Sequence, residues 1–197
     1  AVAINDNADR WSIINVDGEI TAEGPFHKVH PYHDGTAVAD GQLIDLEGKV
    51  ILKREDGFVI EDRFADSRDD AIIARRVTRN RDLSRYVILR RSTAEHLADI
   101  PNELSPDGGF FHGLAMVRDS QSRKCGYISR EGRLVIPADF HSAERFRNGF
   151  AEVGISSLRD KGVINSAGEV IWKPTRRPEL PPEEAVPGKV REGIPGN

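Results

Sequence analysis

The sequence predicts an all-β protein made of short antiparallel hairpins in series, and two recurring patterns support this prediction. In the first, an Ile is followed four residues later by a Gly, as in GYISREGRLVIP (126–137) and GVINSAGEVIWK (162–173). In the second, an aromatic residue precedes a Gly by three residues and an Ala by five. The last two copies of the first pattern begin at Ile128 and Ile164, 36 residues apart (164 − 128). A fixed period of this length is typical of repeat proteins.

The Ile–Gly pattern predicts a hairpin in which the Ile faces inward and the Gly occupies the left-handed position of the turn. It occurs with a polar residue after each Ile, at Ile14/Gly18, Ile44/Gly48, Ile128/Gly132 and Ile164/Gly168. A degenerate copy lies in the middle of the chain, where Ile88 takes the anchor position and Ser92 stands in place of the Gly. We therefore expect five hairpins, near residues 11–21, 42–52, 85–93, 125–137 and 161–172.

The second pattern, which begins at Tyr32, Phe110 and Phe146, predicts one more strand ahead of a hairpin. Apolar residues spaced by three follow the hairpins and predict a short turn of helix as the connector, at Phe26/Val29/Tyr32 and Phe140/Ala143/Phe146. Each unit is thus expected to be a three-stranded meander with a connector. Such a unit is too small to bury its own apolar face, so neighbouring units must stack. The period leaves open whether the stack closes into a propeller-like ring or remains an open array.

As a set, these patterns resemble the WG repeat (WG-containing or KWG repeat) family of bacterial proteins. The resemblance is carried by FFHGLAMV (110–117), KCGYISREGRLVIPADF (124–140), FRNGFAEV (146–153) and the Trp11 of RWSIINVDG. Cys125 and Lys161 stand where the family has Trp. The resemblance implies a β-repeat domain over residues 1–173, with a degenerate unit near 64–104, and it implies an interaction scaffold. It carries over no catalytic residue.

The same alignment bears on the start of the chain. Ala1 precedes Trp11 by ten residues, as Ala115 precedes Cys125 and Ala151 precedes Lys161. We therefore interpret the chain as a segment of something longer, or as processed from it. The sequence contains a single Cys and no apolar run of the roughly 18 residues that a membrane span needs. We expect a cytoplasmic protein, with export as the alternative if a targeting segment has been removed before Ala1.

Residues 174–197 form a different kind of segment, which holds six of the eleven prolines. Proline cannot donate to a sheet and fixes its own φ angle, so strands are excluded there. We predict an extended tail or linker, with docking on the domain or on a partner as the alternative.

A cluster of Arg in the degenerate unit is the candidate binding surface. Its members are Arg75, Arg76, Arg79, Arg81, Arg85, Arg90 and Arg91. Arg forms forked contacts with carboxylates, so we expect a protein partner with an acidic face. The alternative is a solvated hairpin paired with the acidic run between Glu61 and Asp70. That run would also repel a nucleic-acid backbone. Together with the net charge of −4, this argues against nucleic acid as the partner.

Two other candidate sites have stronger structural explanations. His27, His30 and His33 are a candidate metal site, but Pro31 interrupts any helix that would place them on one face. Cys125 could act as a nucleophile, but no base is near it in sequence, and a small buried apolar residue is the better interpretation.

The preferred function is therefore a non-catalytic β-repeat scaffold that binds a protein partner. One alternative is a carbohydrate-active or other hydrolase domain with loop carboxylates, and another is anion or nucleic-acid binding through the Arg75–Arg91 cluster. The sequence lacks the common motifs of nucleophilic hydrolases, nucleotide-binding loops and zinc proteases. We expect no cofactor and regard enzymatic activity as the less favoured outcome.

Overall fold

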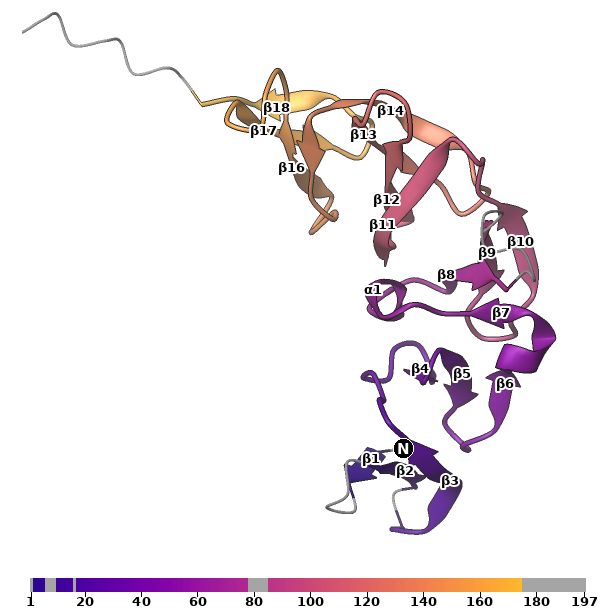
Figure 1. The fold of residues 1–197 in the computed structure, drawn as a ribbon. Coiled ribbons are helices and arrows are strands. Elements are labelled where there is room, and N and C mark those ends of the chain that lie inside the picture. The colour runs from indigo at the N-terminus through magenta and orange to yellow at the C-terminus, as the bar shows by residue number, and fades with distance from the viewer. Residues whose placement is uncertain (1, 6–9, 16, 78–84, 175–197) are drawn as a thin grey trace, which may run out of the picture.

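The computed structural model describes residues 2–5, 10–15, 17–77 and 85–174, and these segments form five antiparallel sheets in series (Figure 1). Each sheet is a simple meander in which strands adjacent in sequence are paired. We name the sheets units 1 to 5 in chain order. The predicted all-β fold of about five repeats is confirmed. The proline-rich segment beyond Pro174 lies outside the described residues.

The first two units have three strands each. Unit 1 contains β1 (Val2–Asn5), β2 (Trp11–Ile14) and β3 (Ile20–Phe26), and unit 2 contains β4 (Thr36–Ala39), β5 (Gln42–Asp45) and β6 (Val50–Leu52). Unit 3 contains β7 (Phe58–Val59), β8 (Ala71–Arg76), β9 (Tyr86–Arg90) and β10 (His96–Asp99), with the 3-10 turn η1 (Arg54–Asp56) before β7 and the short helix α1 (Asp62–Ala65) after it.

The last two units have four strands each. Unit 4 contains β11 (Leu104–Phe111), β12 (Leu114–Asp119), β13 (Cys125–Ile128) and β14 (Leu134–Phe140). Unit 5 contains β15 (Ser142–Ala143), β16 (Phe150–Gly154), β17 (Lys161–Asn165) and β18 (Val170–Trp172).

All five predicted hairpins are present, as β2–β3, β5–β6, β9–β10, β13–β14 and β17–β18. The turn glycines Gly18, Gly48, Gly132 and Gly168 have φ angles of 83°, 81°, 73° and 83°, the left-handed region that glycine tolerates best. The polar residue after the Ile anchor closes the turn. In the first hairpin, the Asn15 Oδ1 accepts hydrogen bonds from the backbone N–H groups of Asp17 and Glu19.

The degenerate hairpin of unit 3 differs from the expectation at its turn. The Arg90 N–H donates to the Glu95 carbonyl, five residues on, whereas the Asn15 N–H donates to Glu19, four residues on. The turn is therefore one residue longer, and the left-handed position falls on Ala94 (φ 58°) and not on Ser92. The Ser92 N–H instead donates to the Asp70 carboxylate.

The second sequence pattern forms a tight hairpin turn. Both central residues have positive φ in each copy, at Asp34–Gly35, His112–Gly113 and Asn148–Gly149. This is the type I′ geometry, whose twist matches that of the flanking strands. Phe110 lies near the end of β11, whereas Tyr32 and Phe146 directly precede the isolated bridges of His33 and Arg147. In each copy, the Ala is the second residue of the strand that follows the turn.

The prediction of a helical turn in the connectors is wrong for two of them. Residues 26–33 and 140–147 are extended: Val29 forms a bridge to Ala39, and Ala143 in β15 pairs with Val153. A three-residue period also belongs to an extended polyproline-type chain, so the apolar spacing did not distinguish the two conformations. Among the described connectors, only that of unit 3 contains a helix, α1, which buries Phe64.

The units stack along an open arc, with units 1 and 5 at opposite ends (Figure 1). The described units therefore form an open array and not a closed ring, two arrangements that the sequence did not distinguish. Apolar clusters fill the junctions between units. The cluster between units 4 and 5, for example, joins Tyr127 and Ile136 to Ala151, Val153 and Ile164.

Close backbone contacts also hold the stack together, because hairpin turns rest on the last strand of the preceding unit. A Cβ atom added to Gly48 would lie 2.5 Å from the Thr21 carbonyl oxygen, and one added to Gly132 would lie 2.7 Å from that of Asp99. One added to Gly168 would lie 3.1 Å from the Ile136 Cγ2. Gly is thus required at these turns for stacking as well as for backbone conformation. Within the described segments, no helix is long and apolar enough to cross a membrane.

Candidate functional site

Members of the predicted Arg cluster form separate ion pairs in the structure. The Arg75 Nε lies 2.6 Å from the Glu61 carboxylate, and Arg76 lies 3.5 Å from that of Asp99. Arg90 contacts both Asp70 and Glu95, and hydrogen bonds to Glu95 and then Asp70 raise the pKa of its guanidinium. These three Arg side chains are therefore paired with carboxylates of their own unit.

Arg91 belongs to the protein interior. Its side chain is 0% exposed and donates hydrogen bonds to Thr36 in unit 2 and to the carbonyl of Ser67. Desolvation by burial lowers its pKa to about 10. Of the remaining predicted residues, Arg85 is exposed, and Arg79 and Arg81 lie outside the described residues.

The three candidate metal ligands point to three different carboxylates. His27 lies 3.3 Å from Asp40, His30 lies 3.0 Å from Asp62, and His33 lies 3.6 Å from Asp66. The first pair lies within unit 2, and the other two link its connector to unit 3. Among the described residues, no three His, Cys, Asp or Glu side chains form a group that could hold a metal ion.

Cys125 is buried in β13, and desolvation raises the pKa of its thiol. A raised pKa disfavours the thiolate, which is the nucleophilic form. The geometry matches the interpretation of Cys125 as a small apolar residue.

The outer face of unit 5, at the end of the arc, is a surface that the sequence did not predict. Cross-strand pairs place Glu152, Val163 and Trp172 side by side on this face, and Phe150 lies two residues before Glu152 in β16. We call these four residues the end face. Phe150 and Trp172 are 49% and 56% exposed, although large aromatic side chains are usually buried.

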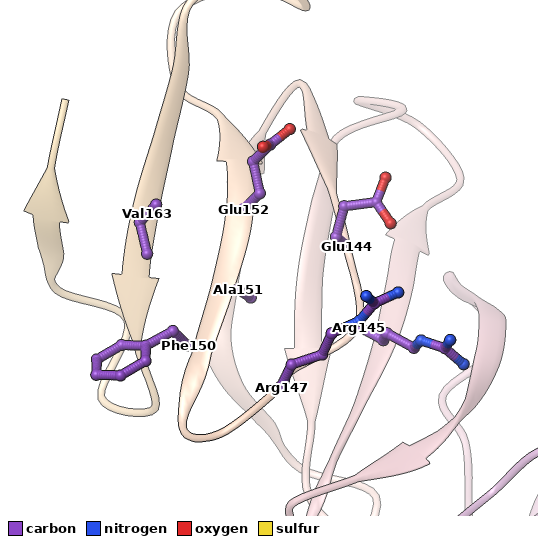
Figure 2. A pocket seen from close by; sticks show the side chains of 7 residues that line it. All are labelled: Glu144, Arg145, Arg147, Phe150, Ala151, Glu152 and Val163. Atoms are coloured by element: carbon purple, nitrogen blue, oxygen red, sulfur yellow. The ribbon is translucent and has the colours of Figure 1, made fainter. Parts of the chain in front are cut away.

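A pocket of about 430 Å³ opens on the end face (Figure 2). It is lined by Glu144, Arg145, Arg147, Phe150, Ala151, Glu152 and Val163. Figure 2 shows the two carboxylates near one end of the pocket and the Phe150 ring near the other. Arg145 is held in place by Asp66 at 2.5 Å and by the Phe111 ring. The pocket therefore combines an apolar wall with fixed charges of both signs.

The end face is equivalent to a surface that is covered one unit earlier. Adding 36 to Leu114, Met116, Tyr127 and Ile136 of unit 4 gives Phe150, Glu152, Val163 and Trp172 of unit 5. Tyr127 and Ile136 are 0% and 1% exposed, because unit 5 packs on them. The 36-residue period of the sequence identifies these equivalent positions. It does not indicate which of the two units has them exposed.

A comparison with known protein families identifies one repeat in this region. The family model of the WG containing repeat matches residues 126–155. This part of the chain is a WG repeat. No curated protein matches the chain.

The matched WG repeat runs from β13 to just beyond β16 and so crosses the junction between units 4 and 5. It includes Tyr127 and Ile136 on one side of the stacking contact and Ala151 and Val153 on the other. The WG repeat therefore contains residues from both sides of one junction, although Ile164 and Gly168 of that junction lie beyond residue 155. The end face corresponds to the side of such a junction that holds Tyr127 and Ile136, and no described residue buries its aromatic side chains.

Proposed function

We propose that this WG-repeat protein is a non-catalytic scaffold and that it binds a protein partner through the end face. The observation that carries the proposal is the exposure of Trp172 at a position whose equivalent, Ile136, is 1% exposed. Terminal units of repeat proteins normally have a polar outer face, which keeps them soluble. Three of the four end-face residues are apolar instead. A contiguous exposed apolar surface of this kind is typical of an interaction site.

The composition of the surface also suits a protein partner. Trp is among the residues that contribute most to binding energy when they are buried at an interface. Arg147 and Glu152, two charged residues that line the pocket on the end face, would form the polar rim that such interfaces usually have. Arg147 also offers a contact for the acidic partner that the sequence favoured.

The described carboxylates give less support to the hydrolase alternative. A general acid requires a carboxyl group with a raised pKa. Instead, hydrogen bonds from Lys28 and then His30 lower the pKa of Asp62. Asp69 accepts a hydrogen bond from the Gly113 N–H and pairs with Arg130. These contacts suit structural carboxylates.

The experiment that tests the proposal is a pull-down from the source organism with three versions of the purified chain. Trp172→Glu changes the end face, and Leu158→Glu is the control, because Leu158 is 65% exposed and lies outside that face. We expect a stoichiometric protein partner with the wild type and with Leu158→Glu, but not with Trp172→Glu. A partner that binds all three equally would overturn the end face as the docking site, and turnover on a glycan panel would overturn the scaffold.

A further inference from the structure

A second pocket, of about 320 Å³, lies where units 3, 4 and 5 meet. It is formed by the loop after α1, the turn between β11 and β12, and the connector before β16. Figure 1 shows α1 and the start of β12 on the concave side of the arc. Proteins built from stacked repeats use such concave surfaces for binding. We call this site the inner pocket, and its lining includes Arg68, Phe111, His112, Arg145, Arg147 and Asn148.

The inner pocket is lined by three Arg side chains and by no carboxylate. Arg145 pairs at 2.5 Å with Asp66, which lies outside the lining. Within the described segments, no carboxylate pairs with the guanidinium of Arg68 or with that of Arg147. Two positive charges therefore remain without a partner in one pocket, although the net charge of the protein is −4.

Contacts between units hold the walls of the inner pocket in place. The Arg68 N–H donates at 3.0 Å to a carbonyl of β11, which fixes the loop after α1 on unit 4. The Arg145 guanidinium lies over the Phe111 ring, 4.8 Å from its centroid. The Asn148 N–H donates to the His112 Nε2 at 3.1 Å, so the Nδ1 of the neutral ring is a donor. The cationic groups are thus carried by a pre-formed pocket.

The fold does not explain why Arg stands at position 147. Arg147 directly follows the aromatic residue of the second sequence pattern, where units 2 and 4 have His33 and Phe111. Because the same turn forms with three such different side chains, it does not require a cation. Exposed charges also contribute little to stability, so the two unpaired Arg side chains have no evident structural role.

We infer that the inner pocket binds a dianionic oxyanion group of a protein partner, either two adjacent carboxylates or one phosphorylated side chain. The planar guanidinium of Arg donates paired hydrogen bonds to both kinds of group. Two unpaired Arg match two carboxylates in charge, and a phosphorylated side chain carries nearly as much charge at neutral pH.

This site is distinct from the end face. Arg145 and Arg147 line both pockets, but Arg68 and His112 line the inner pocket and not the pocket on the end face. Trp172, which carries the proposed function, lines neither of them. The inner pocket therefore adds an anion-binding site to the proposed apolar docking surface.

A change at Arg68 tests the inner pocket without altering the end face. Arg68→Gln removes one of the two unpaired charges. Arg123→Gln is the matched control, because Arg123 is also exposed and lies beyond the far end of β12 from the His112 turn. At the rise of an extended strand, the two ends of β12 are about 20 Å apart. Both variants lose one exposed positive charge, so only the place of the lost charge differs.

The test is a nuclear magnetic resonance titration of the isotope-labelled full chain with capped peptides at constant ionic strength. One peptide carries two adjacent Glu, a second carries one phosphoserine, and a third carries two adjacent Gln. We expect the two anionic peptides to shift the amide signals of Gly113 and Asn148, and the Gln peptide to leave them unchanged. Arg68→Gln should weaken binding of the anionic peptides at least about fivefold, and Arg123→Gln should not.

The tighter of the two anionic peptides identifies which of the two groups the inner pocket prefers. Three other results would overturn the inference: no shift with either anionic peptide, equal weakening in both variants, or binding of inorganic phosphate as tight as that of the phosphopeptide. Equal weakening would mean that binding follows overall charge, and tight binding of inorganic phosphate would mean that the ligand is a free ion. Trp172→Glu should leave the titration unchanged, so the inner pocket and the end face are tested separately.

Discussion

The Arg91 Nε donates a 2.7 Å hydrogen bond to the Thr36 Oγ1, and both side chains are buried although 55 residues separate them. A second nitrogen of the same guanidinium donates to the Ser67 carbonyl at 2.9 Å. Arg91 therefore joins units 2 and 3 by a forked contact with several acceptors. In the degenerate unit, this contact replaces the close glycine turn that other units place on their neighbours.

We expect Arg91→Lys to destabilise the fold by about 2 kcal/mol, because a single ammonium cannot satisfy acceptors that lie in a fork. The matched control is Arg90→Lys, which changes the adjacent residue in an exposed ion pair and should change the stability little. Chemical denaturation of both variants measures the difference. Equal effects would show that Arg91 is not a structural link.

A second prediction concerns the turns that rest on a neighbouring unit. Gly132→Ala should destabilise more than Gly149→Ala, although both residues have positive φ. The new methyl group meets the Asp99 carbonyl at 2.7 Å in the first variant and open space in the second. Gly149→Ala should cost about 1–2 kcal/mol for the backbone alone, and Gly132→Ala at least about 1 kcal/mol more. Denaturation midpoints of the two variants measure the difference. Equal losses of stability would mean that the Gly132 turn does not pack on unit 3.

The Cys125 thiol should be unreactive in the native protein. It is buried, and its raised pKa leaves little thiolate at neutral pH. A thiol reagent should label it only as fast as the fold opens, and denaturant should speed the labelling by orders of magnitude. Fast labelling in native buffer would restore Cys125 as a candidate nucleophile.

The stability of the protein should fall as the pH drops below about 6.5, in part because of His33. Burial, followed by the charges of Arg91 and Arg68, lowers the pKa of His33 from 6.5 in the unfolded chain. The unfolded chain therefore binds more protons than the folded chain in the range just below pH 6.5, so unfolding becomes more favourable there. His33→Gln should reduce this slope. Stability measured from pH 8 to 5 that is identical in both proteins would contradict the assignment.

Removal of residues 176–197 should leave the melting temperature nearly unchanged if the proline-rich segment is an unpacked linker. A fall of many degrees would mean that the segment packs on the repeat domain. Thermal unfolding followed by circular dichroism measures the melting temperatures of the full and the shortened chain.

The sequence was sufficient for features that depend on a few neighbouring residues. The Ile–Gly spacing located the hairpins, because Gly132 and Gly168 adopt a left-handed conformation that side chains resist. In contrast, the spacing of Phe140, Ala143 and Phe146 was misinterpreted, since a period of three fits both a helical turn and an extended chain. Local chemistry predicted strands and turns, but not the path between units.

The features that bear on function depend on contacts between distant segments, and only the tertiary structure decided them. A repeat does not state the rotation from one unit to the next, so the sequence alone did not distinguish an open array from a ring. It was the stacking that buried Arg91 against Thr36 and so removed it from the predicted binding surface. The same stacking covered Ile136 and left its equivalent, Trp172, exposed, because burial depends on whether another unit follows in space.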